Sequence, residues 1–169
     1  LDNCATVDEV IAACSETNIR NLPQDYVRLH FLVTDGNGQN AVIEFLEGQL
    51  VATTGEDLDK KVIANSTYQL SIDYYNQGGN PDLPATASLN RFYNAAVMVD
   101  AYNNEDIVDY CYSIMEATAQ RHTQRRIVYD ITNKRIYLRS QVNNQLRYID
   151  FSAFDFSCQS EPLVYQEST

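Results

Sequence analysis

Few side chains of the types that most often do chemistry occur in this chain. It contains four cysteines and two histidines in 169 residues. They are Cys4, Cys14, Cys111, Cys158, His30 and His122. The cysteines form no C-x-x-C pair and the histidines no H-x-x-x-H pattern, so neither a zinc site nor a histidine-based metal centre is predicted. We expect the thiols to behave as small buried apolar groups. Disulfide formation is the alternative if the compartment is oxidising.

Motifs of common catalytic machinery are also missing. The sequence has no G-x-S-x-G, no Walker loop and no H-E-x-x-H. Composition and spacing by themselves therefore support only an acidic α+β domain, with no cofactor and no metal expected.

The charge balance excludes some partners. Asp and Glu number 23 against 12 Lys and Arg, giving a net charge of −11 and a pI near 4.4. Such a chain is not expected to bind nucleic acid, because phosphates need a basic surface. Apolar residues make up 44% of the chain, enough for a folded core, yet no run approaches the ~20 apolar residues of a membrane span.

The basic residues are unevenly spread. Seven of the twelve lie between Arg121 and Arg147, with only Asp130 opposing them. They could form an anion-binding strip, or a basic face that docks an acidic partner. Their alternation with apolar residues favours a solvated face of a sheet.

Hydrophobic spacing predicts the elements that must position any site. Thr6 followed by Glu9 is a capping box and predicts a helix start, whereas an alternation of period two begins at Tyr26. Strands are expected at 26–34, 41–46, 49–54 and 62–63, helices at 68–75, 88–101 and 105–119, and strands again at 126–131, 135–140 and 146–149. Strands 41–46 and 126–131 are apolar enough to be covered on both faces. Antiparallel strands on either side of a block of helices indicate a layered α+β fold.

The helices should each bury one face. In the second half of the chain the inward residues are expected to be Phe92, Ala95, Ala96 and Val99, then Ile107, Cys111, Ile114 and Met115.

Five segments match, in order, the motifs of one enzyme family. They are 3–10 (NCATVDEV), 35–45 (DGNG followed by AVIEF), 62–68 (VIANSTY), 88–96 (SLNRFYNAA) and the strands of 137–157. In these segments the chain resembles the choloylglycine hydrolase and penicillin V acylase family. The resemblance covers nearly the whole chain, although the motif proline expected after Asn65-Ser66 is absent.

The resemblance implies a fold and a reaction. The family has the N-terminal nucleophile fold, a four-layer αββα sandwich with antiparallel sheets. Its members hydrolyse linear, non-peptide amides: conjugated bile salts, penicillin V and N-acyl homoserine lactones. The nucleophile is a cysteine at the first position of the mature enzyme, and its own α-amino group can act as the base because that amine titrates near pH ~8.

The matched motifs all belong to the C-terminal half of the family. The nucleophile, with its neighbouring arginine and aspartate, is therefore expected upstream of Leu1, and Cys4 does not replace it. We expect residues 1–169 to be the C-terminal portion of one N-terminal nucleophile hydrolase domain, inactive alone. Its expected partners are a small-molecule amide substrate and the N-terminal half of the same enzyme.

Two family site positions occur in the chain, Asn65 and Arg91. The resemblance implies that the Asn65 amide donates to the oxyanion of the tetrahedral intermediate. It places Arg91 near the nucleophile, where a cation favours the thiolate. On the residues alone, Asn65 satisfies backbone groups and Arg91 forms a surface ion pair. Ser88 and Thr86 are expected to be helix caps.

Two other functional interpretations remain open. The chain could be a non-catalytic binding or structural protein that kept the half-fold, or an unrelated α+β domain matched by chance. The short interval between Asn65 and Arg91 resembles the Gram-negative-like branch of the family, which implies a periplasmic or secreted enzyme; a cytoplasmic location also stays open. An exposed sheet face or edge is expected, and with it a homo-oligomer.

Overall fold

The computed structural model describes residues 3–17, 29–155 and 157. The chain contains two compact units, residues 1–100 and residues 101–169. That the whole chain is part of one domain stays a prediction.

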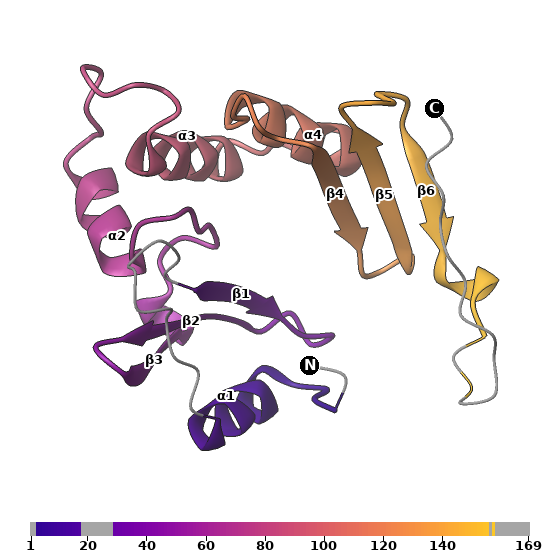
Figure 1. The fold of residues 1–169 in the computed structure, drawn as a ribbon, viewed down its shortest axis with the longest axis horizontal. Helices are drawn as coiled ribbons and strands as arrows, with labels where there is room; N and C mark the ends of the chain where they lie inside the picture. Colours follow the sequence, from indigo (N-terminus) through magenta and orange to yellow (C-terminus); the bar gives the residue numbers. More distant parts are fainter. Residues whose placement is uncertain (1–2, 18–28, 156, 158–169) are drawn as a thin grey trace. The chain divides into compact units, whose positions relative to one another are not determined.

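The described residues of the first unit form a three-stranded antiparallel sheet and three α-helices (Figure 1). Its elements are α1 (Val7–Glu16), β1 (His30–Thr34), β2 (Asn40–Leu46), β3 (Gln49–Thr54), the short 3-10 helix η1 (Gly55–Asp57), α2 (Tyr68–Asn76) and α3 (Ser88–Asp100). The strands follow one another in the sheet as β1-β2-β3 and pair antiparallel, as expected for these three strands. The predicted strand start at residues 26–28 lies outside the described residues.

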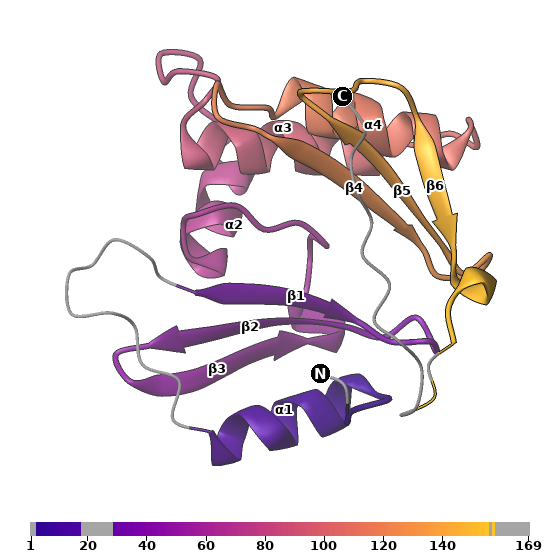
Figure 2. The ribbon, with the colours of Figure 1, turned by 45° about the vertical axis from the view of Figure 1, so that its right-hand side comes forward.

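Helix α1 packs on one face of this sheet (Figure 2). Its buried residues Val7 and Val10 join Ala41, Ile43 and Phe45 of β2 in a hydrophobic cluster. Residues 41–45 are all buried, so β2 is covered on both faces as predicted. The predicted capping box also forms, because Thr6 and Glu9 satisfy each other's backbone N–H groups at the start of α1.

The turn between β1 and β2 fixes α1 through Asp35. One oxygen of this carboxylate accepts from the backbone N–H groups of Asn37 (2.8 Å) and Gln39 (3.0 Å), and the other from that of Val7 (3.3 Å). Burial alone would raise the pKa of Asp35, but these backbone donors outweigh burial and hold the pKa below its usual range. A turn residue therefore also caps the first residue of α1.

Helices α2 and α3 pack together through aromatic rings. Tyr68 and Phe92 meet edge to face, with their centroids 6.3 Å apart, and Phe92 is fully buried. In the loop between the helices, Gly79 has a φ of +74°, and a Cβ there would lie 3.2 Å from the ring of Tyr93. Ala95 and Ala96 are buried as predicted, but Val99 is 41% exposed because it lies on the outward face of the last turn.

The second unit is a helix packed on a second antiparallel sheet. Its elements are α4 (Ile107–Ala117), β4 (Arg125–Asp130), β5 (Arg135–Ser140), β6 (Arg147–Asp150) and the 3-10 helix η2 (Phe151–Ala153), and the strand order is β4-β5-β6. Tyr112 of α4 is 2% exposed, and its hydroxyl donates to the Arg126 carbonyl. The predicted inward face of α4 is wrong at Ile107, which is 51% exposed in the first helical turn.

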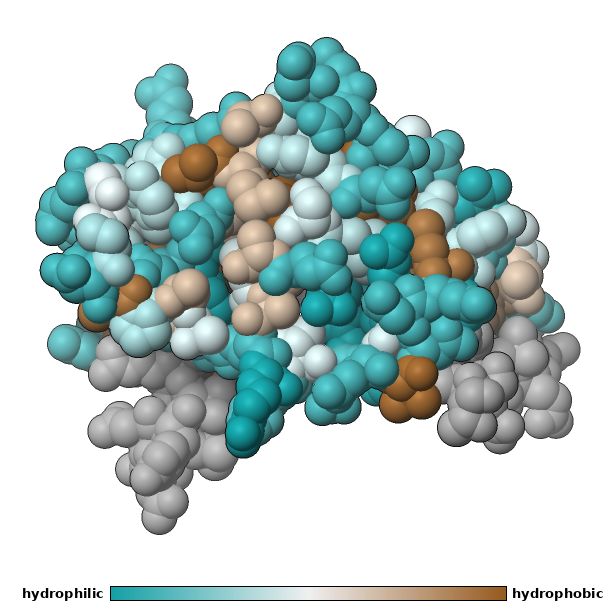
Figure 3. Space-filling model, turned by 90° about the horizontal axis from the view of Figure 1, so that it is seen from above, coloured by the Kyte–Doolittle hydropathy of each residue, from teal (hydrophilic) through white to brown (hydrophobic). Residues whose placement is uncertain are grey.

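Among the described residues of the second unit, α4 covers one face of strand β4, and the other face is exposed. Ile127 and Tyr129 point away from α4 and are 41% and 63% exposed. Within the second unit only the face of β4 towards α4 is covered, and coverage of its other face stays a prediction. On the face drawn in Figure 3, hydrophilic residues predominate and hydrophobic side chains lie singly or in small groups.

We predict that Asp35 makes folding stability depend on pH in the acidic range. Its folded pKa is depressed, so its contribution is present above the unfolded pKa of about 3.9 and is lost as the pH falls through the folded pKa. Asp35→Asn should unfold at lower urea concentration than the wild type at pH 7, and the difference should shrink as the pH falls through the folded pKa of Asp35. Exposed Asp57→Asn is the control. A difference between Asp35→Asn and the wild type that does not change with pH contradicts the assignment.

Candidate active site

The segment that leads into α2 is an irregular loop. Leu58 and Val62 are buried, and the hydroxyl of Tyr68 accepts from the Lys60 N–H (2.8 Å) and donates to the Lys60 carbonyl (2.9 Å). The predicted fourth strand at Val62–Ile63 is wrong. Both main-chain polar groups of Lys60 are bonded to a side chain, so they are not available to pair with a strand.

Lys60 also ties this loop to the two helices. Its ammonium lies 2.9 Å from Asp100 at the end of α3 and 4.7 Å from the centre of the Tyr75 ring. The hydroxyl of Tyr75 donates to the same Asp100 oxygen (2.8 Å). The hydrogen bond to Asp100 raises the pKa of Lys60, and the bonds from Lys60 and Tyr75 lower the pKa of Asp100, so the pair is charged at neutral pH.

The start of α2 is placed by Glu44 of β2. This carboxylate is 3% exposed and lies on the face of β2 opposite α1. The N–H of Tyr68, the first residue of α2, donates to it at 3.1 and 3.2 Å, and Nδ1 of His30 lies 3.3 Å away. A carboxylate is favoured at a helix N-terminus because the unpaired amides there carry partial positive charge.

Asn65 and Arg91, predicted from separate motifs, are in direct contact. The Arg91 Nη2 donates to the Asn65 Oδ1 at 2.5 Å, and the Arg91 Nε donates to the Thr86 carbonyl at 3.2 Å. Burial lowers the pKa of the Arg91 guanidinium, which nevertheless stays a cation at neutral pH. The two residues are 26 positions apart, and the start of α3 brings them together.

The contact with Arg91 decides how the Asn65 amide is oriented. A guanidinium has only donors, so the amide atom that faces it must be the oxygen. The Nδ2 group is then turned away from Arg91, and it has no hydrogen-bond partner among the described residues. Asn65 therefore presents two N–H donors in a fixed direction at an exposed position.

Ser88 is also part of this site, in a role that the sequence did not predict. Its Oγ accepts from the N–H groups of Asn65 (2.9 Å) and Ser66 (2.8 Å). It lies within the first turn of α3 and bonds this loop, so the prediction of a helix cap is wrong for Ser88. The serine of the S-x-x-R pattern was the available signal, since it lies one turn before Arg91.

Known acylases and hydrolases are similar to this chain in sequence or in fold. No family model matches the chain. A curated penicillin V acylase of Pectobacterium atrosepticum is 24% identical over 197 aligned residues, covering 93% of this chain and 52% of the relative. The structure of penicillin V acylase from Agrobacterium tumefaciens aligns with a TM-score of 0.72 and 23% identity, covering 95% of this chain and 56% of that one. A variant of the conjugated bile acid hydrolase from Clostridium perfringens aligns with a TM-score of 0.74 and 20% identity, covering 92% and 61%.

The chain has the fold of these acylases and hydrolases. The predicted resemblance and the predicted N-terminal nucleophile hydrolase fold class are confirmed. In keeping with an αββα fold, each unit contains an antiparallel sheet with a helix on one face. The chain spans between 52% and 61% of the length of these three proteins.

The thiols within this penicillin V acylase-like fold are packing groups. Cys4 and Cys14 lie against the cluster between α1 and β2, and Cys111 of α4 is half-buried. Burial raises the pKa of the Cys111 thiol, which disfavours a thiolate there. The three described cysteines are free, and Cys158 lies outside the described residues.

The basic strip is not simply a solvated face. Arg126 and Arg139 lie directly opposite each other on β4 and β5, on the face that α4 covers. The Arg139 guanidinium lies 4.3 Å from the centre of the Tyr112 ring. The Nε atoms of both arginines are buried and without a hydrogen-bond partner in the described part of the chain.

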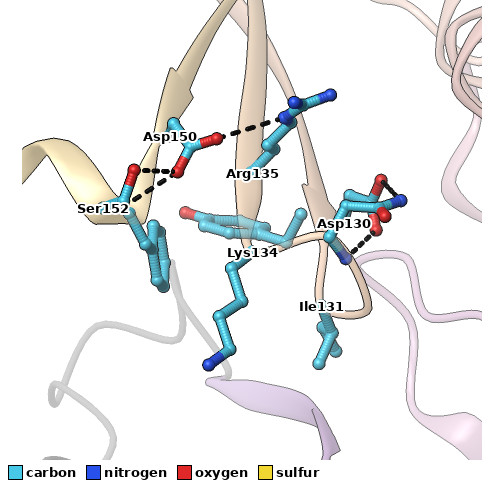
Figure 4. Close-up of a pocket in the computed structure, with 9 residues that line it drawn as sticks. Asp130, Ile131, Lys134, Arg135, Asp150 and Ser152 are labelled. Atoms are coloured by element: carbon cyan, nitrogen blue, oxygen red, sulfur yellow. Dashed lines mark hydrogen bonds and ion pairs between the residues drawn. The ribbon is translucent and has the colours of Figure 1, made fainter.

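A hollow of about 650 Å³ lies in the second unit, beside the β4–β5 turn and η2 (Figure 4). Its walls are apolar at Tyr129, Ile131 and Phe151. Among its charged groups, Arg135 Nε donates to Asp150 at 3.3 Å. Neither Asn65 nor Arg91 lines it, so it is not part of the candidate site.

No described helix is long and apolar enough to cross a membrane. No three His, Cys, Asp or Glu residues among the described positions are grouped so that they could hold a metal ion.

We predict that removing the Glu44 carboxylate destabilises the fold. Glu44→Ala leaves the buried Tyr68 N–H without its acceptor, so the free energy of unfolding should fall by about 1–3 kcal/mol in urea titrations followed by circular dichroism. Exposed Glu16→Ala, near the end of α1, is the matched control and should stay within ~0.5 kcal/mol of the wild type. Equal effects of the two substitutions would show that Glu44 does not hold α2.

Proposed function

We propose that this chain is the C-terminal part of a cysteine N-terminal nucleophile amidase, with the catalytic cysteine upstream of Leu1. The substrates are linear, non-peptide amides of the penicillin V, N-acyl homoserine lactone or conjugated bile salt type. The observation that supports this most is the contact between Asn65 and Arg91, found within a fold shared with a penicillin V acylase and a bile acid hydrolase. By the same resemblance, the enzyme is periplasmic or secreted.

In this proposal Asn65 is an oxyanion donor. The upstream thiolate attacks the amide carbonyl, the carbonyl oxygen becomes an anion, and the Asn65 Nδ2 donates to it. The amine leaves with a proton from the cysteine's α-ammonium group, and water then hydrolyses the thioester. The Asn65 amide is oriented by Arg91 before the substrate arrives, so little reorganisation is needed when the charge develops.

Arg91 has two effects in this mechanism. Its donation to Oδ1 polarises the Asn65 amide and makes its N–H groups better donors. Its positive charge, held by the Thr86 carbonyl at Nε, also favours negative charge nearby, on the thiolate and then on the oxyanion. Because the guanidinium is partly buried, that charge is less screened than at an open surface.

We predict that Asn65→Ala in the full polypeptide lowers kcat on penicillin V by about 10²–10³-fold, because one preformed oxyanion donor is lost. Release of phenoxyacetate, followed by chromatography, is the measurement. Exposed Asn76→Ala, at the end of α2, is the matched control and should leave kcat unchanged. An Asn65→Ala enzyme with wild-type kcat would remove Asn65 from the catalytic site.

A second prediction concerns the chain by itself. Residues 1–169 alone should hydrolyse none of the three substrate classes, whereas the polypeptide extended upstream to a processed cysteine should hydrolyse at least one. Mass spectrometry of the extended protein checks for that N-terminal cysteine. If the extended protein is inactive on all three, the alternative of a non-catalytic protein with the same fold is favoured.

A further inference from the structure

We propose that Ser88 is a positioning residue for the oxyanion donor Asn65, an inference that rests on the proposed function. The Ser88 Oγ accepts two hydrogen bonds from consecutive backbone amides, those of Asn65 at 2.9 Å and Ser66 at 2.8 Å. The Ser66 Oγ lies 2.9 Å from the same oxygen. Three groups of the loop therefore converge on one side chain of α3.

The bonding capacity of a hydroxyl matches this arrangement. A serine hydroxyl has two acceptor lone pairs and one proton. The two amides use both lone pairs, and the proton is then free to lie between the Ser88 and Ser66 oxygens. Two successive N–H groups that point at one oxygen fix the peptide plane between Asn65 and Ser66. The position of the Asn65 Cα, from which the donor amide extends, is fixed with it.

Ser88 and Arg91 act on opposite ends of Asn65. They are three residues apart in the first turn of α3 and so lie on one side of the helix. Ser88 holds the Asn65 main chain, and Arg91 holds its side-chain oxygen. The Nδ2 group is the remaining polar end of the residue. A rigid helix thus sets the donor at two points, and such preorganisation is what keeps a catalytic group in its productive geometry.

The role is separate from helix capping. The main chain of α3 begins with the Arg91 N–H donating to the Ala87 carbonyl at 2.9 Å, and this bond does not involve the Ser88 side chain. Within the described residues, the hydrogen bonds of the Ser88 hydroxyl all go to positions 65 and 66. Ser88→Ala therefore removes these hydrogen bonds to the loop, which together act as a clamp on it. The first turn of α3 should be kept, because alanine favours a helix.

The test compares wild type, Ser88→Ala, Ser88→Thr and Asn65→Ala in the full polypeptide. Ser113→Ala is the matched control, since Ser113 is itself exposed and, among the described residues, its hydroxyl donates to the Tyr110 carbonyl one turn earlier. Two quantities are measured: amide hydrogen exchange at Asn65 and Ser66, and steady-state kinetics on penicillin V. Thermal unfolding of every variant is recorded alongside.

In Ser88→Ala we expect exchange at both amides to accelerate roughly tenfold, as the loss of a typical hydrogen bond predicts. We expect kcat to fall by about 10- to 100-fold, less than for Asn65→Ala, with KM within about twofold of the wild type. Ser88→Thr keeps the hydroxyl and should restore both quantities, and Ser113→Ala should match the wild type. A purely structural role would not give this split between kcat and KM or the rescue by threonine.

Unchanged exchange at Asn65 and Ser66 in Ser88→Ala overturns the inference, whatever the activity. Faster exchange with wild-type kcat, in an enzyme that Asn65→Ala inactivates, overturns it too, because the clamp would then not matter to the donor. A wild-type polypeptide that hydrolyses no amide refutes the proposed function instead. The exchange data still decide in that case whether Ser88 holds the loop.

Discussion

The candidate site depends on one buried carboxylate. Glu44 is surrounded by the strand that carries it, by His30 on the neighbouring strand and by the first amide of α2. Few arrangements stabilise a carboxylate that is 3% exposed, and a helix N-terminus is one of them. Because the carboxylate cannot turn towards water, α2 has to begin where it does. The position of Asn65, three residues before the start of α2, is restricted by the same contact.

The start of α3 is the second constraint on that residue. The ring of Phe92 is fully buried against Tyr68, the residue whose amide binds Glu44. The aromatic contact thus orients α3 against the same point that the carboxylate fixes. Packing therefore carries Ser88 and Arg91 to Asn65, and their direct hydrogen bonds then fix the local geometry. A hydrogen bond contributes only about 1 kcal/mol net, so the burial has to do most of this placement.

Local signals in the sequence predicted local structure well. The capping box of Thr6 and Glu9 depends on residues three positions apart, and it formed. The ordered motifs also named Asn65 and Arg91, which are in contact. Pairings across many positions were not visible: Glu44 with Tyr68, and Ser88 with Ser66. The apolar pair Val62–Ile63 resembled a strand because periodicity cannot show whether a neighbouring strand is there to pair with.

In the proposed mechanism, asparagine at position 65 serves activity at some cost in the strength of its contact with Arg91. An aspartate there would bind the Arg91 cation more strongly, since a charge-assisted pair is stronger than a bond to a neutral amide. It would, however, have only acceptors, and could give nothing to an oxyanion. Asparagine bonds Arg91 through its oxygen and keeps both N–H groups for another partner. A purely structural contact with an arginine would be served better by the acid, so the amide is the residue expected where the free donor matters more than the strength of the pair.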